Sequence, residues 1–232
     1  MKLGIIGAME QEVETLLGLL ENAVPYEKAG STYYEGTLDG LGVVVVQCGI
    51  GKVNAALCVQ VLCDVFAVTH VVNTGIAGSL KPELDIGDLV ISRDAMYHDV
   101  DCVHFGYTMG QMPGMPVSYE ADPLLVKLAF QAAESVNPGH TVLGRIASGD
   151  QFVAEKSLKE RIIAVTGAHC TEMEGTAIAQ AATRNGIPFV IIRAISDKAD
   201  DSAEMDYPTF ERLASHRCAA VTREFAKQLK KL

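Results

Sequence analysis

The sequence lacks any apolar run that approaches the length of a membrane span. A transmembrane helix needs about 20 consecutive apolar residues, and the apolar run from Leu3 to Ile6 meets Glu10 and Glu12 too soon to be a secretion signal. CxxC pairs are also lacking, and the six scattered cysteines do not have the density of a disulfide scaffold. We therefore expect a cytoplasmic protein whose thiols are reduced and mostly buried.

An excess of positive charge is lacking as well. The 232 residues include 29 acidic and 19 basic side chains, which gives a net charge of -10. Such a surface repels nucleic acid phosphates and anionic lipids. The composition therefore argues against nucleic acid and membrane partners and favours a neutral or cationic small molecule.

Linkers, repeats and low-complexity segments are missing too, so we predict one domain over residues 1–232. Short β-rich runs alternate with amphipathic stretches, and Asp39-Gly40 between two of the runs is typical of a tight hairpin. This alternation predicts an α/β fold with three αβα layers around a central mixed, twisted β-sheet. The expected strands are 2–6, 31–38, 41–47, 70–73, 88–92, 142–147, 169–171 and 189–195. The expected helices are 9–20, 52–65, 123–135, 154–165, 175–185 and 207–230.

Ligands of such sheets bind at the carboxyl ends of the strands, so the residues after each strand are the candidates for a site. Glu12 follows the first strand, where an acidic residue can also simply complement a helix dipole. The segment 48–54 is rich in glycine but fits neither the Walker nor the dinucleotide pattern. Residues 74–78 are small, which permits either close approach of a ligand or a tight turn. Phe152, in a loop after a strand, could stack on a flat base or cover the core.

Two later segments carry a stronger signal. Glu172 and Glu174 lie at a strand-to-helix junction, where alternation directs only one of them into the cleft. Arg193 lies inside the most apolar strand and needs an acidic partner there, because a buried guanidinium must be paired. Asp197 ends the same strand. Capping alone explains poorly why Glu12, Glu174 and Asp197 all follow strands with Arg193 beneath them.

The stretch 96–118 has neither helical nor strand periodicity and is expected to be a long functional or interface loop. It contains His98, Asp99, Asp101 and His104, which are residue types that bind metals. Their spacing matches no helical or zinc pattern, so we favour an interface loop and expect no metal.

Three carboxylates beside one cleft suit the hydrolysis of an N-ribosidic bond. This reaction develops an oxocarbenium-like sugar cation and a purine anion, so an acid that protonates the base improves the leaving group. A second carboxylate can orient water, and a third can hold the ribose hydroxyls. Negative charge around the cleft also stabilises a cationic transition state.

The same residues resemble those of the 5′-methylthioadenosine/S-adenosylhomocysteine nucleosidases, within the nucleoside phosphorylase-like superfamily. The resemblance runs from Met1 to the final helix, and its strength is that many short motifs occur in order. These motifs are Gly4-Ile5-Ile6-Gly7-Ala8-Met9 with Glu12, Gly49-Ile50-Gly51-Lys52-Val53, Asn73-Thr74-Gly75 with Ala77-Gly78, Tyr97-His98-Asp99, Phe105-Gly106-Tyr107, Ser148-Gly149-Asp150 with Phe152, Glu172-Met173-Glu174, and Arg193-Ala194-Ile195-Ser196-Asp197.

The resemblance implies an enzyme that releases adenine and a thioribose from both nucleosides, in methionine salvage and methyl-cycle recycling. It implies that Asp197 is the general acid at adenine N7, that Glu12 activates water and that Glu174 binds the ribose hydroxyls, with Arg193 in the same catalytic group. Phe152 is then expected to stack on adenine. The other implied substrate contacts are the Val153 backbone at the adenine edge, Met173 under the sugar, Met9, Ile50 and Tyr207 at the thioalkyl side, and Ile76, Ala77, Gly78, Glu172, Ser196 and Ala199.

The resemblance also implies a homodimer in which Phe105 and Pro113 enter the neighbouring subunit's pocket, and it implies no cofactor. This sequence has Ile76 where the family often has Ser, and Tyr207 where Phe is frequent. These two departures leave open the preference among 5′ substituents.

Three alternatives remain open at this point. A purine nucleoside phosphorylase would need guanidinium groups for phosphate, whereas no arginine precedes Arg93 and Glu12 would repel the anion. A hydrolase of a futalosine-type nucleoside would use nearly the same residues. A non-catalytic nucleoside sensor would be expected to lack the acid or the water-orienting group, and this sequence has both.

Overall fold

The computed structural model describes residues 1–200 and 202–232. Its strands form one mixed sheet in the order β10-β6-β8-β9-β5-β1-β4-β3-β2, with β7 added beside β6. The Asp39-Gly40 hairpin joins the antiparallel pair β3 and β4, as the sequence predicts. The strands are β1 (Leu3–Gly7), β2 (Glu21–Lys28), β3 (Ser31–Leu38), β4 (Leu41–Gln47), β5 (His70–Ser79), β6 (Leu89–Tyr97), β7 (Tyr119–Glu120), β8 (Thr141–Ser148), β9 (Cys170–Glu172) and β10 (Phe189–Asp197).

The sheet closes on itself at one end. Strand β10 pairs in parallel with β5 and antiparallel with β6, while β9 joins β8 to the far end of β5. Strands β5, β10, β6, β8 and β9 therefore form a ring, here called the closed half. Strands β1 to β4 extend from β5 as the open half. Strand β5 belongs to the ring and also carries the open half through its pairing with β1.

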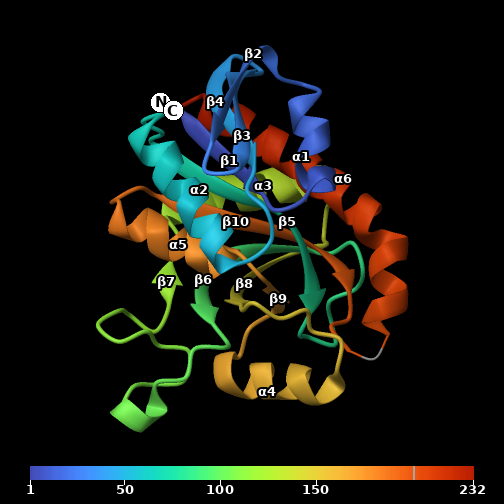
Figure 1. The fold of residues 1–232 in the computed structure, drawn as a ribbon. Helices are drawn as coiled ribbons and strands as arrows, with labels where there is room; N and C mark the ends of the chain where they lie inside the picture. Colours follow the sequence, from blue (N-terminus) through green and yellow to red (C-terminus); the bar gives the residue numbers. More distant parts are fainter. Residues whose placement is uncertain (201) are drawn as a thin grey trace.

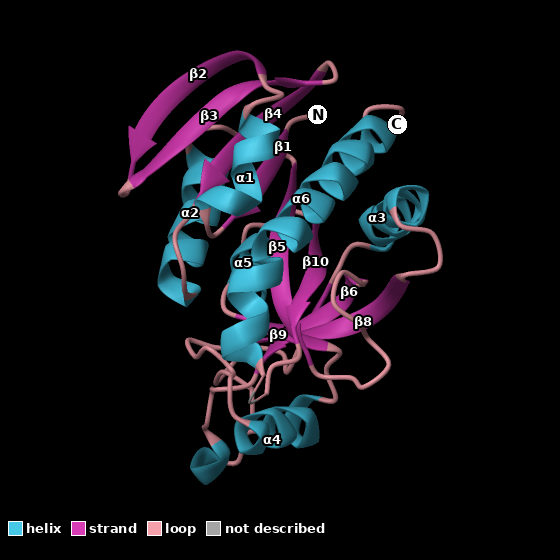
Figure 2. Cartoon of the chain, turned by 90° about the vertical axis from the view of Figure 1, so that its right-hand side faces the viewer, coloured by secondary structure: helices cyan, strands magenta, loops and turns pink. Residues whose placement is uncertain are grey.

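Helices cover both faces of the sheet. The helices α2 (Lys52–Asp64) and α5 (Gly175–Arg184) pack on each other over one face, in front of the strands in Figure 1. The opposite face is covered by α1 (Glu10–Leu17), α3 (Pro123–Val136) and the long α6 (Ala203–Leu229), and Figure 2 shows α6 running beside the strands. The helix α4 (Lys156–Thr166) lies at the end of the closed half, against β8. The three αβα layers and the mixed sheet match the sequence prediction.

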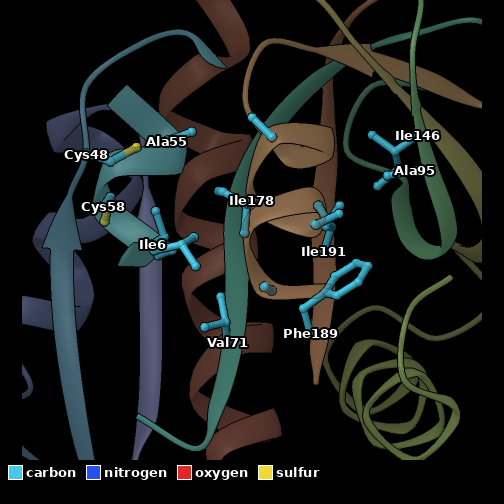
Figure 3. Packing of buried hydrophobic residues seen from close by; sticks show 14 of the residues in the cluster. Ile6, Cys48, Ala55, Cys58, Val71, Ala95, Ile146, Ile178, Phe189 and Ile191 are labelled. Atoms are coloured by element: carbon cyan, nitrogen blue, oxygen red, sulfur yellow. The ribbon is translucent and has the colours of Figure 1, made fainter. Parts of the chain in front are cut away.

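Alternation along the inner strands divides the core between the two faces. On β4, Val44 and Val46 face the α2 and α5 side, whereas Val43 and Val45 face the α6 side. Figure 3 shows the first of these clusters, with Ile6 of β1 among apolar side chains from both helices. Because successive strand residues point to opposite faces, a continuous apolar strand supplies both cores.

The structure corrects several element boundaries. Strand β2 was not predicted, because all eight of its residues are exposed and it shows no apolar alternation. Strand β5 was expected to end at residue 73, but it continues to Ser79 and includes residues 74–78, for which a turn was one of two alternatives. Strand β6 extends to Tyr97, and α6 begins at Ala203 with Pro208 inside it, a residue more usual in a first turn. Across residues 1–200 and 202–232, no helix has the length and apolar character needed to cross a bilayer.

Candidate active site

A cavity of about 380 Å³ lies where β1, β5, β9 and β10 end, beside the closed half of the sheet. A larger cavity of about 650 Å³ lies between α1, β3 and the start of α2, and none of the predicted site residues lines it. The smaller cavity is therefore the candidate active site, because the predicted acidic residues line it. Its lining residues are Ala8, Met9, Glu12, Ile50, Ile76, Ala77, Gly78, Phe152, Thr171, Glu172, Met173, Glu174, Ser196, Asp197 and Tyr207.

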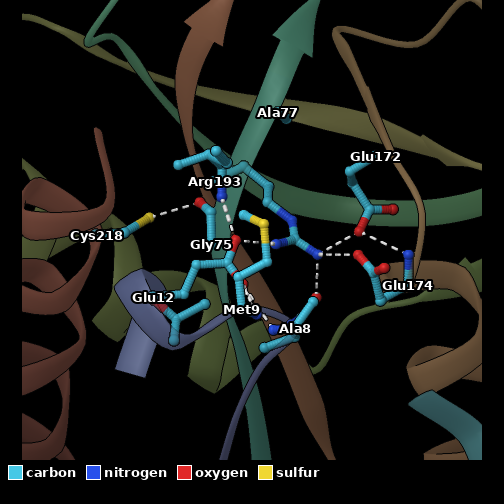
Figure 4. A network of polar contacts seen from close by, with 12 residues as sticks. Ala8, Met9, Glu12, Gly75, Ala77, Glu172, Glu174, Arg193 and Cys218 are labelled. Atoms are coloured by element: carbon cyan, nitrogen blue, oxygen red, sulfur yellow. Dashed lines mark hydrogen bonds and ion pairs between the residues drawn. The ribbon is translucent and has the colours of Figure 1, made fainter. Parts of the chain in front are cut away.

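Arg193 lies beneath the floor of the cavity and organises its acidic groups. Its guanidinium is ion-paired with Glu172, donates to Asn73 Oδ1 at 2.5 Å, and lies 3.9 Å from Glu12 and 4.0 Å from Glu174 (Figure 4). Burial alone would lower the pKa of Arg193, but the three carboxylates together raise it above its usual value. The buried arginine thus has the acidic partners that the sequence demanded.

Gly75 on β5 makes this arrangement possible. A Cβ atom on residue 75 would lie 2.1 Å from Arg193 Nη1 and 2.2 Å from Glu12 Oε1. No side chain fits between the guanidinium and the carboxylate. The glycine therefore permits the close approach of two charged groups from different elements.

Glu172 lines the cavity, yet most of the acceptor sites of its carboxylate are occupied. It accepts hydrogen bonds from Arg193, from the Ser148 hydroxyl, and from the backbone N–H groups of Glu174 (3.1 Å) and Gly175 (2.7 Å). A carboxylate offers about four acceptor sites. Glu172 Oε2 therefore has no acceptor capacity left for a ligand and Oε1 has about one site, so the residue acts mainly as the partner of Arg193 and as a cap for α5.

Glu12 is held by backbone amides at the start of α1. Its Oε2 accepts from the N–H groups of Ala8 (2.6 Å) and Met9 (3.0 Å), and its Oε1 accepts from Ile76 N–H (3.0 Å). Burial raises the pKa of Glu12, while Arg193 and these amides oppose the shift. Three of about four acceptor sites are used, so one remains for a group in the cavity.

Glu174 has more free capacity. Its Oε1 accepts from Gly51 N–H at 2.7 Å, and no other hydrogen bond to this carboxylate occurs among the described residues. Burial, reinforced by the charge of Glu172, raises the pKa of Glu174 to about 8, although Arg193 and the Gly51 amide act in the other direction. The carboxylate can therefore accept further hydrogen bonds from hydroxyls in the cavity.

Asp197 ends β10 where the strand register shifts opposite Gly78. Its Oδ2 accepts from the Ser196 hydroxyl at 2.8 Å, and its Oδ1 accepts from Ala199 N–H at 2.8 Å. Burial raises the pKa of Asp197, while these two hydrogen bonds lower it. The raised pKa favours a carboxyl group that can hold a proton closer to neutral pH.

The remaining wall is apolar. The rings of Phe152 and Tyr207 meet edge to face, with centroids 5.5 Å apart, and the Tyr207 hydroxyl lies 3.1 Å from Met9 Sδ. Phe152 and Ile50 are each about half exposed, at 51% and 53%. The cavity is therefore acidic at its floor and apolar toward its opening.

The structure brings most of the predicted residues to this cavity. Val153 lines a small adjoining cavity of about 40 Å³ rather than the main one. Ala199 is fully buried and contacts Asp197 through its amide instead of lining the cavity. Phe105 and Pro113 lie in the exposed loop between β6 and β7, outside the cavity of their own chain. The other predicted substrate contacts line the cavity, as do Glu12, Glu174 and Asp197.

Ala8 and Thr171 also line the cavity, although the sequence did not single them out. Ala8 lies within the motif Gly4 to Met9 and Thr171 directly precedes the motif Glu172 to Glu174, and these positions were the available signal. In the loop 96–118, Asp99 is ion-paired with Lys52, whereas Asp101 and His104 are exposed. Within the described part of the chain, no three His, Cys, Asp or Glu side chains form a group able to hold a metal.

Comparison with known proteins identifies the family. A profile of the phosphorylase superfamily matches residues 2–227. A 5′-methylthioadenosine/S-adenosylhomocysteine nucleosidase from Chromohalobacter salexigens is 42% identical over 232 residues, which cover 98% of this chain and 97% of the relative. This chain belongs to the 5′-methylthioadenosine/S-adenosylhomocysteine nucleosidase family.

Solved structures agree with this family membership. The nucleosidase from Colwellia psychrerythraea, determined with adenine, has a TM-score of 0.96 and 40% identity, with 99% of this chain and 96% of that chain covered. A futalosine hydrolase from Helicobacter pylori has a TM-score of 0.94 at 31% identity, with 98% and 97% covered. The nucleosidase fold is thus shared by both hydrolases, and this chain is more similar in sequence to the methylthioadenosine enzymes.

Proposed function

We propose that this enzyme hydrolyses the N-ribosidic bond of 5′-methylthioadenosine and S-adenosylhomocysteine, and so releases adenine and the corresponding thioribose. One observation carries the proposal: Glu12, Glu174 and Asp197 line a single cavity of about 380 Å³ above Arg193. The family relationship supports the choice of substrates. The reaction belongs to methionine salvage and methyl-cycle recycling.

Asp197 is the general acid. It protonates adenine N7 as the bond to the sugar breaks, so that the base leaves as a neutral molecule. Its buried position and raised pKa support this role, because a proton must be available near neutral pH. The Ser196 hydroxyl and the Ala199 amide hold the carboxyl group in place without occupying all of its oxygen sites.

Glu12 orients the attacking water. Three backbone amides fix its two oxygens and leave about one acceptor site, which suits a single water molecule. Glu174 accepts hydrogen bonds from the ribose hydroxyls, for which its carboxylate has spare capacity. The negative floor of the cavity also stabilises the cationic sugar in the transition state.

The apolar residues position the two ends of the substrate. Phe152 stacks on adenine, the Val153 backbone bonds the adenine edge, and Met173 packs under the sugar. The thioalkyl group lies against Met9, Ile50 and Tyr207. The location of these side chains on the walls of the main and adjoining cavities supports the assignment.

Water rather than phosphate is the nucleophile. A phosphate dianion needs arginine or lysine ligands, and no arginine or lysine is among the described residues that line the cavity. The Glu12 carboxylate would also repel the anion. Futalosine hydrolysis is the weaker candidate, because the futalosine hydrolase compared here is only 31% identical.

The enzyme acts as a homodimer in which Phe105 and Pro113 complete the neighbouring pocket. Phe105 is 76% exposed, and on α2 Val53 and Leu57 are 71% and 49% exposed. Val53 and Leu57, four residues apart on one helix, form an exposed apolar surface, and such a surface favours a protein interface. Ile50 connects this surface to the cavity, since it lines the cavity and is half exposed.

Residues 1–232 act as one nucleosidase domain, because the cavity draws side chains from Ala8 to Tyr207. The enzyme works in the cytoplasm. All six cysteines are free, and four of them are buried, which suits a reducing compartment.

The test is an adenine-release assay with methylthioadenosine in phosphate-free buffer. Adenine release at a rate that added phosphate does not increase supports the hydrolase. Release that requires phosphate identifies a phosphorylase, and binding without release identifies a sensor. A parallel assay with futalosine compares the two hydrolase activities, and a higher kcat/KM for futalosine would reject the substrate assignment.

A further inference from the structure

Three charged residues outside the cavity join the loops that surround it. Lys52, the first residue of α2, donates its backbone N–H to Asp150 Oδ1 at 2.9 Å and its ammonium group to Asp99 Oδ2 at 2.7 Å. The Asp150 N–H donates to the same Asp99 oxygen at 2.9 Å. These three residues are called the aspartate clamp. The clamp ties together the loop before α2, the loop after β6 and the loop after β8.

The clamp is one residue away from the ribose side of the site. Gly51 precedes Lys52, and its N–H is the donor that reaches Glu174 Oε1 at 2.7 Å. At the start of α2, Asp150 therefore accepts a hydrogen bond from the Lys52 N–H, and Glu174 accepts one from the preceding N–H, that of Gly51. A shift of this helix terminus would remove the hydrogen bond to Glu174 even though none of the clamp residues lines the cavity.

The charges and burial of the clamp suit a fixed position. The side chains of Lys52 and Asp99 are 23% and 17% exposed, so their ion pair is partly shielded from water. Burial would raise the pKa of Asp99, but the Lys52 ammonium and the Asp150 amide lower it below its usual value. Asp150 is 50% exposed and 3.8 Å from the ammonium, so its contribution is mainly the hydrogen bond to the helix terminus.

We propose that Asp150, supported by Asp99 and Lys52, is a positioning residue that sets the Gly51 amide and Glu174 for binding of the ribose hydroxyls. The inference rests on the proposed function, because it presupposes that Glu174 binds these hydroxyls. Asp150 also lies two residues before Phe152. The clamp therefore also includes a residue of the loop that carries the proposed adenine-stacking ring.

The experiment compares Asp150→Ala with Asp150→Asn on two substrates. One is methylthioadenosine, and the other is its analogue without the 2′- and 3′-hydroxyls. We expect Asp150→Ala to lower kcat/KM for methylthioadenosine about tenfold, since a hydrogen bond to a charged group carries at least this much. The analogue, which has no hydroxyls to bind, should lose less than about twofold. Asp150→Asn keeps an acceptor oxygen and should recover most of the activity.

Asp64→Ala is the matched control, because Asp64 is an exposed aspartate on the same helix whose hydrogen bond is to Gln60. It should leave both substrates unaffected. Equal losses on the two substrates in Asp150→Ala would show a general structural defect and overturn the inference, as would unchanged activity on methylthioadenosine. If the wild-type enzyme releases no adenine, the proposed function itself fails, and this result is distinct from a failure of the clamp.

Asp99 provides a second arm of the test. Asp99→Ala removes the acceptor of both the Lys52 ammonium and the Asp150 amide, so it should reproduce the selective loss on methylthioadenosine to a smaller extent. Asp99→Asn retains an acceptor and should lose less. If Asp99→Ala lowers kcat/KM equally for both substrates, the proposed role of the clamp in positioning Glu174 is contradicted.

Discussion

The two halves of the sheet bury different kinds of side chain. In the open half, the buried side chains of β1, β3 and β4 are aliphatic, with Tyr33 as the one aromatic residue. In the closed half, all five strands bury polar or charged groups, and among them are Asn73, Asp94, Arg193 and Asp197. The open half is therefore an ordinary apolar core, whereas the closed half encloses a hydrogen-bonded polar network.

This difference indicates which part of the sheet serves the active site. Buried charges need partners and rarely increase stability over an apolar core. Two strands of the closed half, β5 and β9, supply partners to Arg193, and α1, which follows the first strand of the open half, supplies Glu12. We therefore expect mutations in the closed half near the cavity to affect turnover, and mutations in the open half to affect stability.

The sharpest form of the comparison is Asp197→Asn. We expect kcat to fall by at least about a hundredfold, because an amide does not deliver the proton and general acids contribute roughly 10²–10⁴-fold. The free energy of unfolding should change little, since the amide retains the shape and can still accept from Ala199 N–H. Single-turnover assays and urea denaturation measure the two quantities. Near-normal turnover would reject the acid assignment.

Ile5→Ala tests the open half. Ile5, on β1, is fully buried in the part of the core that lies on the α6 side of the sheet. The truncation leaves a cavity, and we expect it to lower the free energy of unfolding by about 3 kcal/mol. The activity per folded molecule should stay near the wild-type value. A large fall in kcat at temperatures where the variant is still folded would contradict the proposal that the open half affects stability and not turnover.

Asp94→Asn examines a buried charge of the closed half that lies away from the cavity. Asp94 Oδ2 accepts from Arg145 Nε at 2.8 Å and Nη2 at 2.5 Å, and Oδ1 lies 3.3 Å from Arg93. We expect a loss of about 2 kcal/mol in stability, below the value for a fully buried pair because both arginines reach solvent. Turnover should be kept. A loss of turnover as large as that of Asp197→Asn would extend the site beyond the cavity.

Glu174→Gln tests the pH dependence of stability. The pKa of Glu174 in the folded protein is about 8, above its ordinary 4.5, so the folded state binds the proton more tightly than the unfolded state. The wild-type protein therefore loses stability as pH rises from about 4.5 to about 8. Glutamine does not ionise, so the Tm of the variant minus that of the wild type should increase from pH 5 to pH 9. A difference that decreases with pH would contradict the raised pKa.

Tyr207→Phe is expected to have the smallest effect. It removes the hydroxyl that contacts Met9 Sδ at the apolar wall of the cavity, where we propose that the thioalkyl group binds. Stability should change by less than about 1 kcal/mol, and kcat for methylthioadenosine should stay within about twofold. The kcat/KM for adenosylhomocysteine, which has a polar tail, should fall more than the kcat/KM for methylthioadenosine, which has a methyl group there. The ratio of the two values should therefore shift toward methylthioadenosine. An unchanged ratio would remove Tyr207 from the determinants of preference.

The sequence predicted the layers and most elements of this fold, because the inner strands and their covering helices have strong apolar patterns. It did not predict β2, whose residues are all exposed, or the closure of the sheet. Closure depends on β10 pairing with both β5 and β6, and such pairings between distant segments leave no local pattern. Residues 74–78 were placed after the strand, because the close approach of charged groups at Gly75 is visible only in three dimensions.

The site was predictable to a similar extent. Glu12 follows β1 and Asp197 ends β10, and the carboxyl ends of these two strands, both parallel to β5, meet at one edge, so their convergence followed from order along the chain. Glu174 follows β9, which pairs antiparallel with the end of β5, so its place in the cavity depends on the closure of the ring. The roles of the neighbouring residues Glu172 and Ala199 depend on hydrogen bonds that cannot be predicted from the spacing of residues in the sequence. Glu172 lines the cavity with most of its acceptor sites used by Arg193, Ser148 and backbone amides, and Ala199 donates its N–H to Asp197 without lining the cavity.

Ring closure also sets the order in which the enzyme can be completed during synthesis. Strand β5 emerges from the ribosome long before β10, yet the ring cannot shut until residues 189–197 are available to pair with it. A growing chain that has reached α5 already carries Glu12 and Glu174, but it has neither Arg193, whose guanidinium lies between them, nor Asp197, the proposed proton donor. Until then the edges of β5 and β6 stay open for pairing with other chains. The last strand to be translated thus both seals the sheet against aggregation and makes it an enzyme.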